Sequence, residues 1–179
     1  MILYIRLLLL RVLSAFRPRM GLWDTARTPF RVMPTDLDVL GHMNNGKFLT
    51  LMDLGRLDLM LRTGMWQKIS EKGWYPVVAG QSITYRRSLN PFKKFDLYTR
   101  LVGFDGPWVY VEQHFCIGRT LYAQAAVRAR FLKKSGGTVD PADMVALTGE
   151  EVQEGVPHWM VAWTAATKPM TEFVPGDAA

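Results

Sequence analysis

The sequence predicts an α+β domain in which an antiparallel β-sheet is wrapped around one long central helix. Two observations predict this class. Residues 46–62 form a helix that is apolar around most of its circumference, and residues 75–134 read as four consecutive strands. A helix that is apolar on nearly all sides has to be buried, and the sheet is the only predicted element large enough to cover it. With 179 residues, 49% of them hydrophobic, the chain can bury such a core.

Residues 1–23 begin with the pattern of an amphipathic, strongly apolar helix that ends at Pro18. Helical periodicity gathers one set of apolar residues on a single side: Ile2, Ile5, Leu8, Leu9, Val12, Leu13 and Phe16. Arg6 and Arg11 interrupt the apolar run, which is therefore too short to span a bilayer. Three interpretations stay open: a helix in a membrane interface with its arginines toward anionic lipid, a cleaved targeting segment, or a helix packed on the protein or on a dimer partner.

The body of the domain is predicted over residues 24–135. A short strand at 28–33 leads through a polar turn at 34–45 to the central helix, and a shorter helix follows at 66–72. Strands are predicted at 75–85, 95–104, 108–117 and 121–132, joined as a meander of antiparallel hairpins. Such a sheet has open edges that dimerisation would pair. Residues 136–179 are expected to form a C-terminal extension of short helices and loops.

Charge and cysteine content exclude several classes of function. The net charge is +6: the N-terminal part of the chain is basic, the middle part is mildly basic and the C-terminal part is acidic. No nucleic-acid-binding module accompanies this charge, so nucleic-acid binding is not expected. Cys116 is the only cysteine, and with three histidines it shows no metal-ligand spacing, so neither a disulfide within the chain nor a metal site is expected. No cofactor is expected, and the protein is placed in the cytoplasm or on a membrane surface.

The densest group of polar residues lies directly before the central helix. Asp36, Asp38, His42, Asn44 and Asn45 fall within ten residues of one another. Taken singly, the aspartates could form turns, an asparagine could cap the helix, and the histidine could be structural. Taken together they point to a site, because a helix start presents free N–H groups to an oxyanion and a nearby carboxylate can act as general base or nucleophile.

The run D-L-D-V-L-G-H-M-N-N-G-K-F-L resembles the signature of hot-dog-fold acyl thioesterases, the 4-hydroxybenzoyl-CoA thioesterase-like superfamily. With Y-R-R-S-L-N-P-F and Y-T-R-L-V-G-F-D, it is similar to the branch named thioesterase superfamily member six. The resemblance implies a hot-dog fold, a homodimer or larger homo-oligomer, and active sites near the subunit interface. It also implies hydrolysis of acyl-CoA or acyl-carrier-protein thioesters in lipid metabolism.

The resemblance also assigns residues. It carries the catalytic carboxylate of the hydroxybenzoyl-CoA enzymes onto Asp38 and the histidine of the plant acyl-carrier-protein enzymes onto His42. The start of the central helix, with Asn44, Asn45 and Gly46, is the expected substrate-binding part, because its amide N–H groups would hold the oxyanion.

Two positions depart from the plant pattern: Leu40 stands where those enzymes have a catalytic asparagine, and Ser88 where they have a carboxylate. An alternative is therefore a non-catalytic hot-dog protein that binds acyl-CoA or a protein partner at a membrane surface. The spacing of Asp38 and His42 disfavours a hydratase or dehydratase. Four nearby basic residues could contact CoA phosphates or simply be solvated: Arg86, Arg87, Lys93 and Lys94.

Overall fold

The computed structural model describes residues 2–149 and 155–167, so part of the predicted C-terminal extension, together with Met1, lies outside the described residues. Its elements follow in chain order: α1 (Ile2–Phe16), β1 (Ala26–Arg31), a 3₁₀ turn (Pro34–Asp36), α2 (Asn45–Arg62), α3 (Met65–Glu71), β2 (Trp74–Tyr85), β3 (Lys94–Asp105), β4 (Trp108–Ile117), β5 (Thr120–Lys133), α4 (Pro141–Thr148) and α5 (His158–Ala166). In the described part of the chain, no helix has the length and apolar character needed to cross a membrane.

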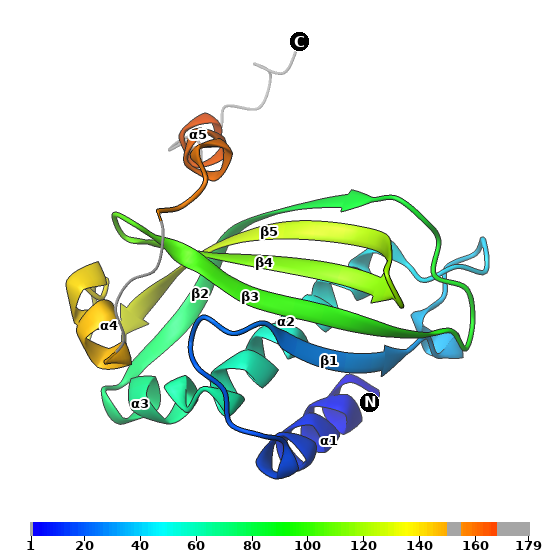
Figure 1. The fold of residues 1–179 in the computed structure, drawn as a ribbon, viewed down its shortest axis with the longest axis horizontal. Helices are drawn as coiled ribbons and strands as arrows, with labels where there is room; N and C mark the ends of the chain where they lie inside the picture. Colours follow the sequence, from blue (N-terminus) through cyan, green and yellow to red (C-terminus); the bar gives the residue numbers. More distant parts are fainter. Residues whose placement is uncertain (1, 150–154, 168–179) are drawn as a thin grey trace.

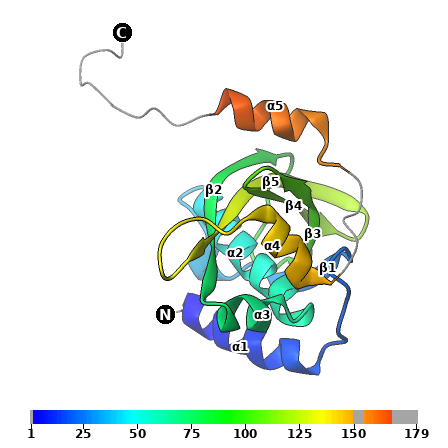
Figure 2. The same ribbon diagram turned by 90° about the vertical axis from the view of Figure 1, so that its left-hand side faces the viewer.

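The predicted α+β architecture is confirmed. Five antiparallel strands form one sheet that curves around α2, and α1 packs along the other side of that helix (Figure 1). Seen from the side in Figure 2, α2 lies between the sheet and α1. The small side chains of Ala123 and Ala125 on β5 are buried in the same core as Leu51 and Met52 of α2. Small residues on this face therefore let the helix lie close to the sheet.

Gly55 marks the closest approach of α2 to the sheet. A Cβ atom at this position would lie 2.7 Å from Leu97 Cδ2 and 2.8 Å from Thr99 Oγ1, both on β3. Atoms at those separations overlap, so the helix can sit at this depth only because the residue has no side chain.

The order of the strands corrects one prediction. The sheet runs β1-β3-β4-β5-β2, so only β3, β4 and β5 form a meander, and β2 lies at the far edge beside β5. The physical reason is the connection after β2, which is too long for a tight hairpin and runs across the end of the sheet. Leu89 in this connection is fully buried, and its carbonyl accepts a hydrogen bond of 2.9 Å from Met43 N–H. The crossing is therefore fixed against the segment that precedes α2.

On the outer face of the sheet, α5 is held by one arginine. The Arg128 guanidinium lies 4.8 Å from the ring centre of Trp108 and 5.3 Å from that of Trp163, and it donates to the Thr164 carbonyl at 3.1 Å. Met160 of α5 is fully buried beside Tyr110. This contact explains why Arg128, a charged residue in the middle of a strand, is almost completely buried.

Candidate functional site

The polar segment before α2 folds into a short, irregular hairpin. Leu37 pairs with Met43 as an isolated bridge, and Asp38 N–H donates to the His42 carbonyl at 2.9 Å. Gly41 adopts a positive φ of 74°, which lets the chain turn tightly between these two arms. The hairpin therefore places Asp38 and His42 at its tip, opposite one another across the turn.

The Asp38 carboxylate is held from one side only. Its Oδ1 accepts the Leu40 N–H at 2.9 Å and the His42 N–H at 3.3 Å. In the part of the chain that the structure describes, Oδ2 accepts no hydrogen bond, and the residue is half-buried. Two backbone donors thus fix the orientation of the carboxylate while one oxygen stays open to water or substrate.

His42 contacts Asp38 with its backbone N–H and carbonyl groups and not with its imidazole ring. The imidazole is exposed, and among the described residues it has no hydrogen-bond partner. It is therefore available to a substrate carbonyl or to a water molecule, but it does not form a side-chain pair with Asp38 in this structure.

The start of α2 is capped by Asn44. The Asn44 side-chain oxygen accepts the Gly46 N–H at 2.8 Å, and the Asn44 carbonyl accepts the Lys47 N–H at 2.8 Å. The cap takes up the Gly46 N–H that the sequence offered as an oxyanion donor, whereas the Asn45 N–H, the first of the helix, is not used by it. Within this group, Asn45 N–H and the positive end of the helix dipole are the features open to an anion.

The structure adds the role of Asp36 and a neighbour, Tyr85, that sequence reasoning missed. Asp36 is fully buried and accepts hydrogen bonds from Met33 N–H at 2.9 Å and from Arg6 on α1, so it holds the base of the hairpin rather than acting in the site. Tyr85 at the end of β2 packs edge-on against Phe48, with ring centres 5.0 Å apart, and its hydroxyl lies 3.5 Å from the Asn45 carbonyl. Burial raises the pKa of Tyr85 above its ordinary value.

An apolar cavity of about 330 Å³ lies between the second half of α2 and the sheet. Leu57, Met60 and Trp66 line it, together with strand residues such as Phe104, and Asp53 and Arg56 border it. Because α2 rises about 1.5 Å per residue, the cavity lies near one end of the helix and Asp38 near the other. Within one chain, the apolar cavity and the candidate carboxylate are therefore separate.

Asp53 and Arg56 form the ion pair expected for neighbours on a helix. Arg56 also donates to Gln113 Oε1 at 2.8 Å, and Gln113 in turn donates to the Met52 carbonyl at 3.0 Å. Burial lowers the pKa of the Arg56 guanidinium, and the Asp53 carboxylate opposes that shift. These contacts tie α2 to β4, so the pair has a structural role.

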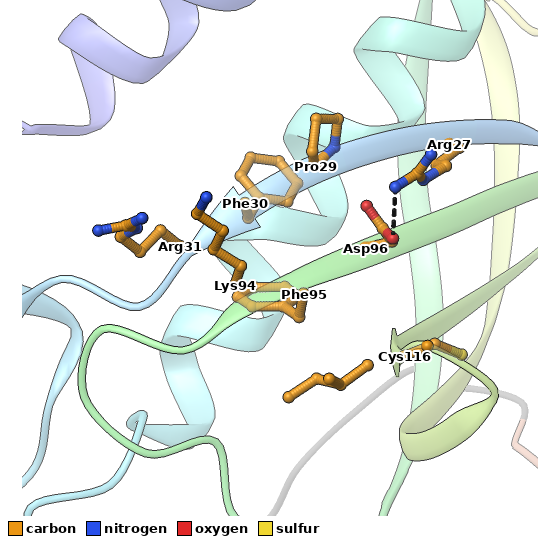
Figure 3. Close-up of a pocket in the computed structure, with 10 residues that line it drawn as sticks. Arg27, Pro29, Phe30, Arg31, Lys94, Phe95, Asp96 and Cys116 are labelled. Carbon is orange, nitrogen blue, oxygen red and sulfur yellow. Dashed lines mark ion pairs between the residues drawn. The ribbon is translucent and has the colours of Figure 1, made fainter.

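A second, more open hollow of about 460 Å³ lies between the ends of β1, β3 and β4 (Figure 3). Arg27 and Asp96 form an ion pair of 2.9 Å across it, and Arg31 and Lys94 supply further positive charge. Cys116 lies at its edge, where burial and the Asp96 carboxylate raise the pKa of the thiol above its ordinary value. The thiol is thus a weak nucleophile at neutral pH.

Comparisons with known proteins match the chain to one superfamily. The sequence profile of the thioesterase-like superfamily matches residues 32–164. Protein THEM6 of Xenopus laevis is 38% identical over 99 residues, which cover 55% of this chain and 48% of that protein. Another THEM6 protein, from Drosophila melanogaster, is matched over 42% of its length, so the chain spans about half the length of these curated relatives.

Solved structures share the fold. The probable thioesterase YbaW from Escherichia coli superposes with a TM-score of 0.65 at 20% identity, covering 69% of this chain and 96% of that one. The DHNA-CoA thioesterase from Staphylococcus aureus superposes with a TM-score of 0.61 at 13% identity, covering 82% of this chain and 97% of that one. At these identities the likeness shows a common hot-dog fold.

Proposed function

Because this chain belongs to the thioesterase-like superfamily, we propose that it hydrolyses the thioester bond of acyl-CoA or acyl-carrier-protein substrates, with Asp38 as the acting carboxylate. The observation that carries the proposal is the geometry of Asp38. Two backbone N–H groups hold Oδ1 in place, while Oδ2 is open on the hairpin that leads into the start of α2. A fixed, partly exposed carboxylate on a segment that runs into an anion-stabilising helix end suits general-base hydrolysis of an acyl group.

The proposed reaction balances without a cofactor. Asp38 Oδ2 takes a proton from water as the water oxygen attacks the thioester carbonyl carbon, and the carbonyl oxygen becomes an oxyanion. The Asn45 N–H and the α2 dipole stabilise that charge, and His42 donates a hydrogen bond to the same oxygen. The carbon–sulfur bond then breaks, and the proton on Asp38 passes to the leaving thiolate, which gives the acid and the free thiol.

The charge around the site favours an anionic carrier such as CoA. Arg86, Arg87 and Lys93 are exposed on the connection that follows β2, and the exposed Lys94 begins β3 directly after it. This connection is fixed beside the site, because the Leu89 carbonyl within it accepts the Met43 N–H. Exposed cations at that position attract the phosphates of CoA or an acidic carrier protein.

A panel of acyl thioesters tests this function. We expect hydrolysis of one or more of acetyl-, octanoyl-, palmitoyl-, oleoyl- and benzoyl-CoA, measured by chromatography of released CoA so that the Cys116 thiol does not interfere with a thiol reagent. The alternative, an acyl-CoA-binding protein without activity, is motivated by Leu40, which is 76% exposed at the tip of the hairpin and offers no polar group. Calorimetric binding of these thioesters without turnover of any of them would favour that alternative.

We also propose that the working unit is a homodimer joined through β2. Of the two edge strands, β1 is short and carries Pro29 and charged side chains, features that protect an edge from pairing. β2 is 12 residues long, and Tyr75, Val78 and Tyr85 along it are each about 40% exposed. When two copies pair their β2 edges about a two-fold axis, their α2 helices run in opposite directions. The start of α2 in one copy then lies toward the end of α2 in the other. Asp38 of each copy would then act on an acyl group held in the partner's apolar cavity.

Hybrid dimers test this arrangement. One parent carries Asp38→Asn, and the other carries Leu57→Trp, which fills the apolar cavity. Each parent homodimer is expected to be nearly inactive, whereas a purified hybrid recovers about half of the wild-type activity, because one of its two composite sites keeps both parts. Hybrids that are no more active than the parents would place carboxylate and acyl pocket in the same chain. Size-exclusion chromatography with light scattering confirms that each preparation is dimeric.

A further inference from the structure

Helix α1 packs on the body of the protein with its polar side inward. Leu10, in the middle of that side, is only 5% exposed, and Arg6 and Arg17 flank it one to two turns away. The helix lies against α2 along its length, as Figure 1 shows. The sequence left open whether these arginines face anionic lipid, and in the structure Arg6 and Arg17 face the protein instead.

Two buried carboxylates hold this orientation. Arg6 donates to both oxygens of Asp36, at 2.9 and 2.6 Å, and Arg17 donates to Asp58 Oδ2 at 3.0 Å. Both aspartates are fully buried, one in the turn before α2 and the other within α2. Because the two ion pairs lie at opposite ends of α1 and on the same side of it, they fix the rotation of the helix about its own axis.

The opposite side of α1 is an apolar stripe that faces away from the protein. It consists of six side chains that are each about half exposed or more: Ile5, Leu8, Leu9, Val12, Leu13 and Phe16. The Ile2 side chain, expected in the same set, lies outside the described part of the structure. Leu8 is 65% exposed and Phe16 84%. A helix on the surface of a soluble domain normally shows the reverse pattern, so this stripe indicates an interaction surface.

We propose that the stripe lies in the surface of a lipid bilayer, with α1 parallel to the membrane plane. The charge pattern favours lipid over a second copy of the chain. No acidic residue occurs before Asp24, and the exposed Arg11 borders the stripe. Two stripes packed on each other would bring Arg11 side chains toward like charge without an acid to pair with, whereas anionic lipid headgroups accept them. Exposed aromatic rings near the two ends of the helix, Tyr4 and Phe16, suit the interface between headgroups and acyl chains.

The helix that would contact the membrane is connected to the candidate site. Asp36, which holds Arg6, lies two residues before Asp38 and accepts the Asn44 N–H through its own carbonyl at 2.8 Å. The helix on the bilayer and the hairpin that carries Asp38 are thus joined by one buried ion pair. The membrane proposal does not depend on whether the chain hydrolyses thioesters.

Vesicle sedimentation with the full chain tests the proposal. We expect the wild type to bind phosphatidylcholine vesicles, and to bind more tightly when phosphatidylglycerol is added. The double variant Leu8→Glu, Val12→Glu should lose at least about tenfold in partition coefficient. The control is Trp159→Glu, which places one such glutamate at another half-exposed apolar residue, on α5, and should bind as the wild type does. Arg11→Gln should bind neutral vesicles normally and lose most of the gain from phosphatidylglycerol.

Two results would overturn the proposal. The first is a wild type that binds neither kind of vesicle; if its oligomeric state also falls in the double variant, the stripe is assigned to contacts between copies of the chain. The second is a double variant that is folded by circular dichroism yet binds like the wild type.

Discussion

Asp38→Asn is expected to lower kcat for the best acyl-CoA substrate by about 10²–10⁴-fold while the fold stays intact. Asparagine keeps the Oδ1 acceptor for the Leu40 and His42 N–H groups, so the hairpin retains its internal hydrogen bonds. What it loses is the open carboxylate oxygen that takes the proton from water. Steady-state kinetics measure the effect, and far-UV circular dichroism with thermal unfolding measures the integrity of the fold.

Asp24→Asn is the matched control. Asp24 is an exposed aspartate whose carboxylate, like that of Asp38, accepts a backbone N–H, here that of Gly21 at 2.8 Å, but it lies outside the site. Its kcat should stay within about twofold of the wild type. Turnover close to that of the wild type in Asp38→Asn would refute the catalytic role. A rise in KM with unchanged kcat would reduce the role of Asp38 to substrate binding.

Much of the fold could be predicted from local patterns. The central helix is predicted from Gly46 and found from Asn45, and the strand from Trp108 to Ile117 has the same limits in both. These elements follow from periodicity and turn residues, which operate over a few positions. The place of β2 in the sheet depends instead on how the long connection after Tyr85 crosses the sheet. The residue pattern within β2 does not indicate the path of that connection.

The candidate residues could be proposed together because they are contiguous, and the hairpin that leads into α2 places Asp38 and His42 opposite one another. The interactions that position the site were not predictable. Arg6 and Asp36 are 30 residues apart, and Arg17 and Asp58 are 41 residues apart. Helical periodicity distinguishes the two sides of α1, but it does not indicate which side faces the protein, because buried carboxylates such as Asp36 and Asp58 can bind arginines of the polar side.

The second large effect is expected at one of those buried carboxylates. Asp58→Ala should lower the free energy of unfolding by about 3–5 kcal/mol, a large part of the roughly 5–15 kcal/mol that stabilises a typical domain. Asp58 Oδ2 accepts the Thr28 hydroxyl at 2.8 Å and Arg17 at 3.0 Å, and Arg62 lies 3.8 Å away. The substitution leaves two mostly buried guanidinium groups without their counter-charge. Urea denaturation monitored by circular dichroism measures the loss.

The partners of Asp58 make the experiment specific. Arg17→Ala should cost less than Asp58→Ala, because Arg17 comes from α1 and its removal leaves Asp58 still near Arg62 and bonded to Thr28. The double variant should cost less than the sum of the two single variants, since the pair is already broken by either change. Glu71→Ala removes an exposed acid at the end of α3 and should change the free energy of unfolding by no more than about 0.5 kcal/mol. If Asp58→Ala proved as mild as Glu71→Ala, the buried carboxylate would not be what holds α1 to the central helix, and the outward direction of the apolar stripe would need another cause.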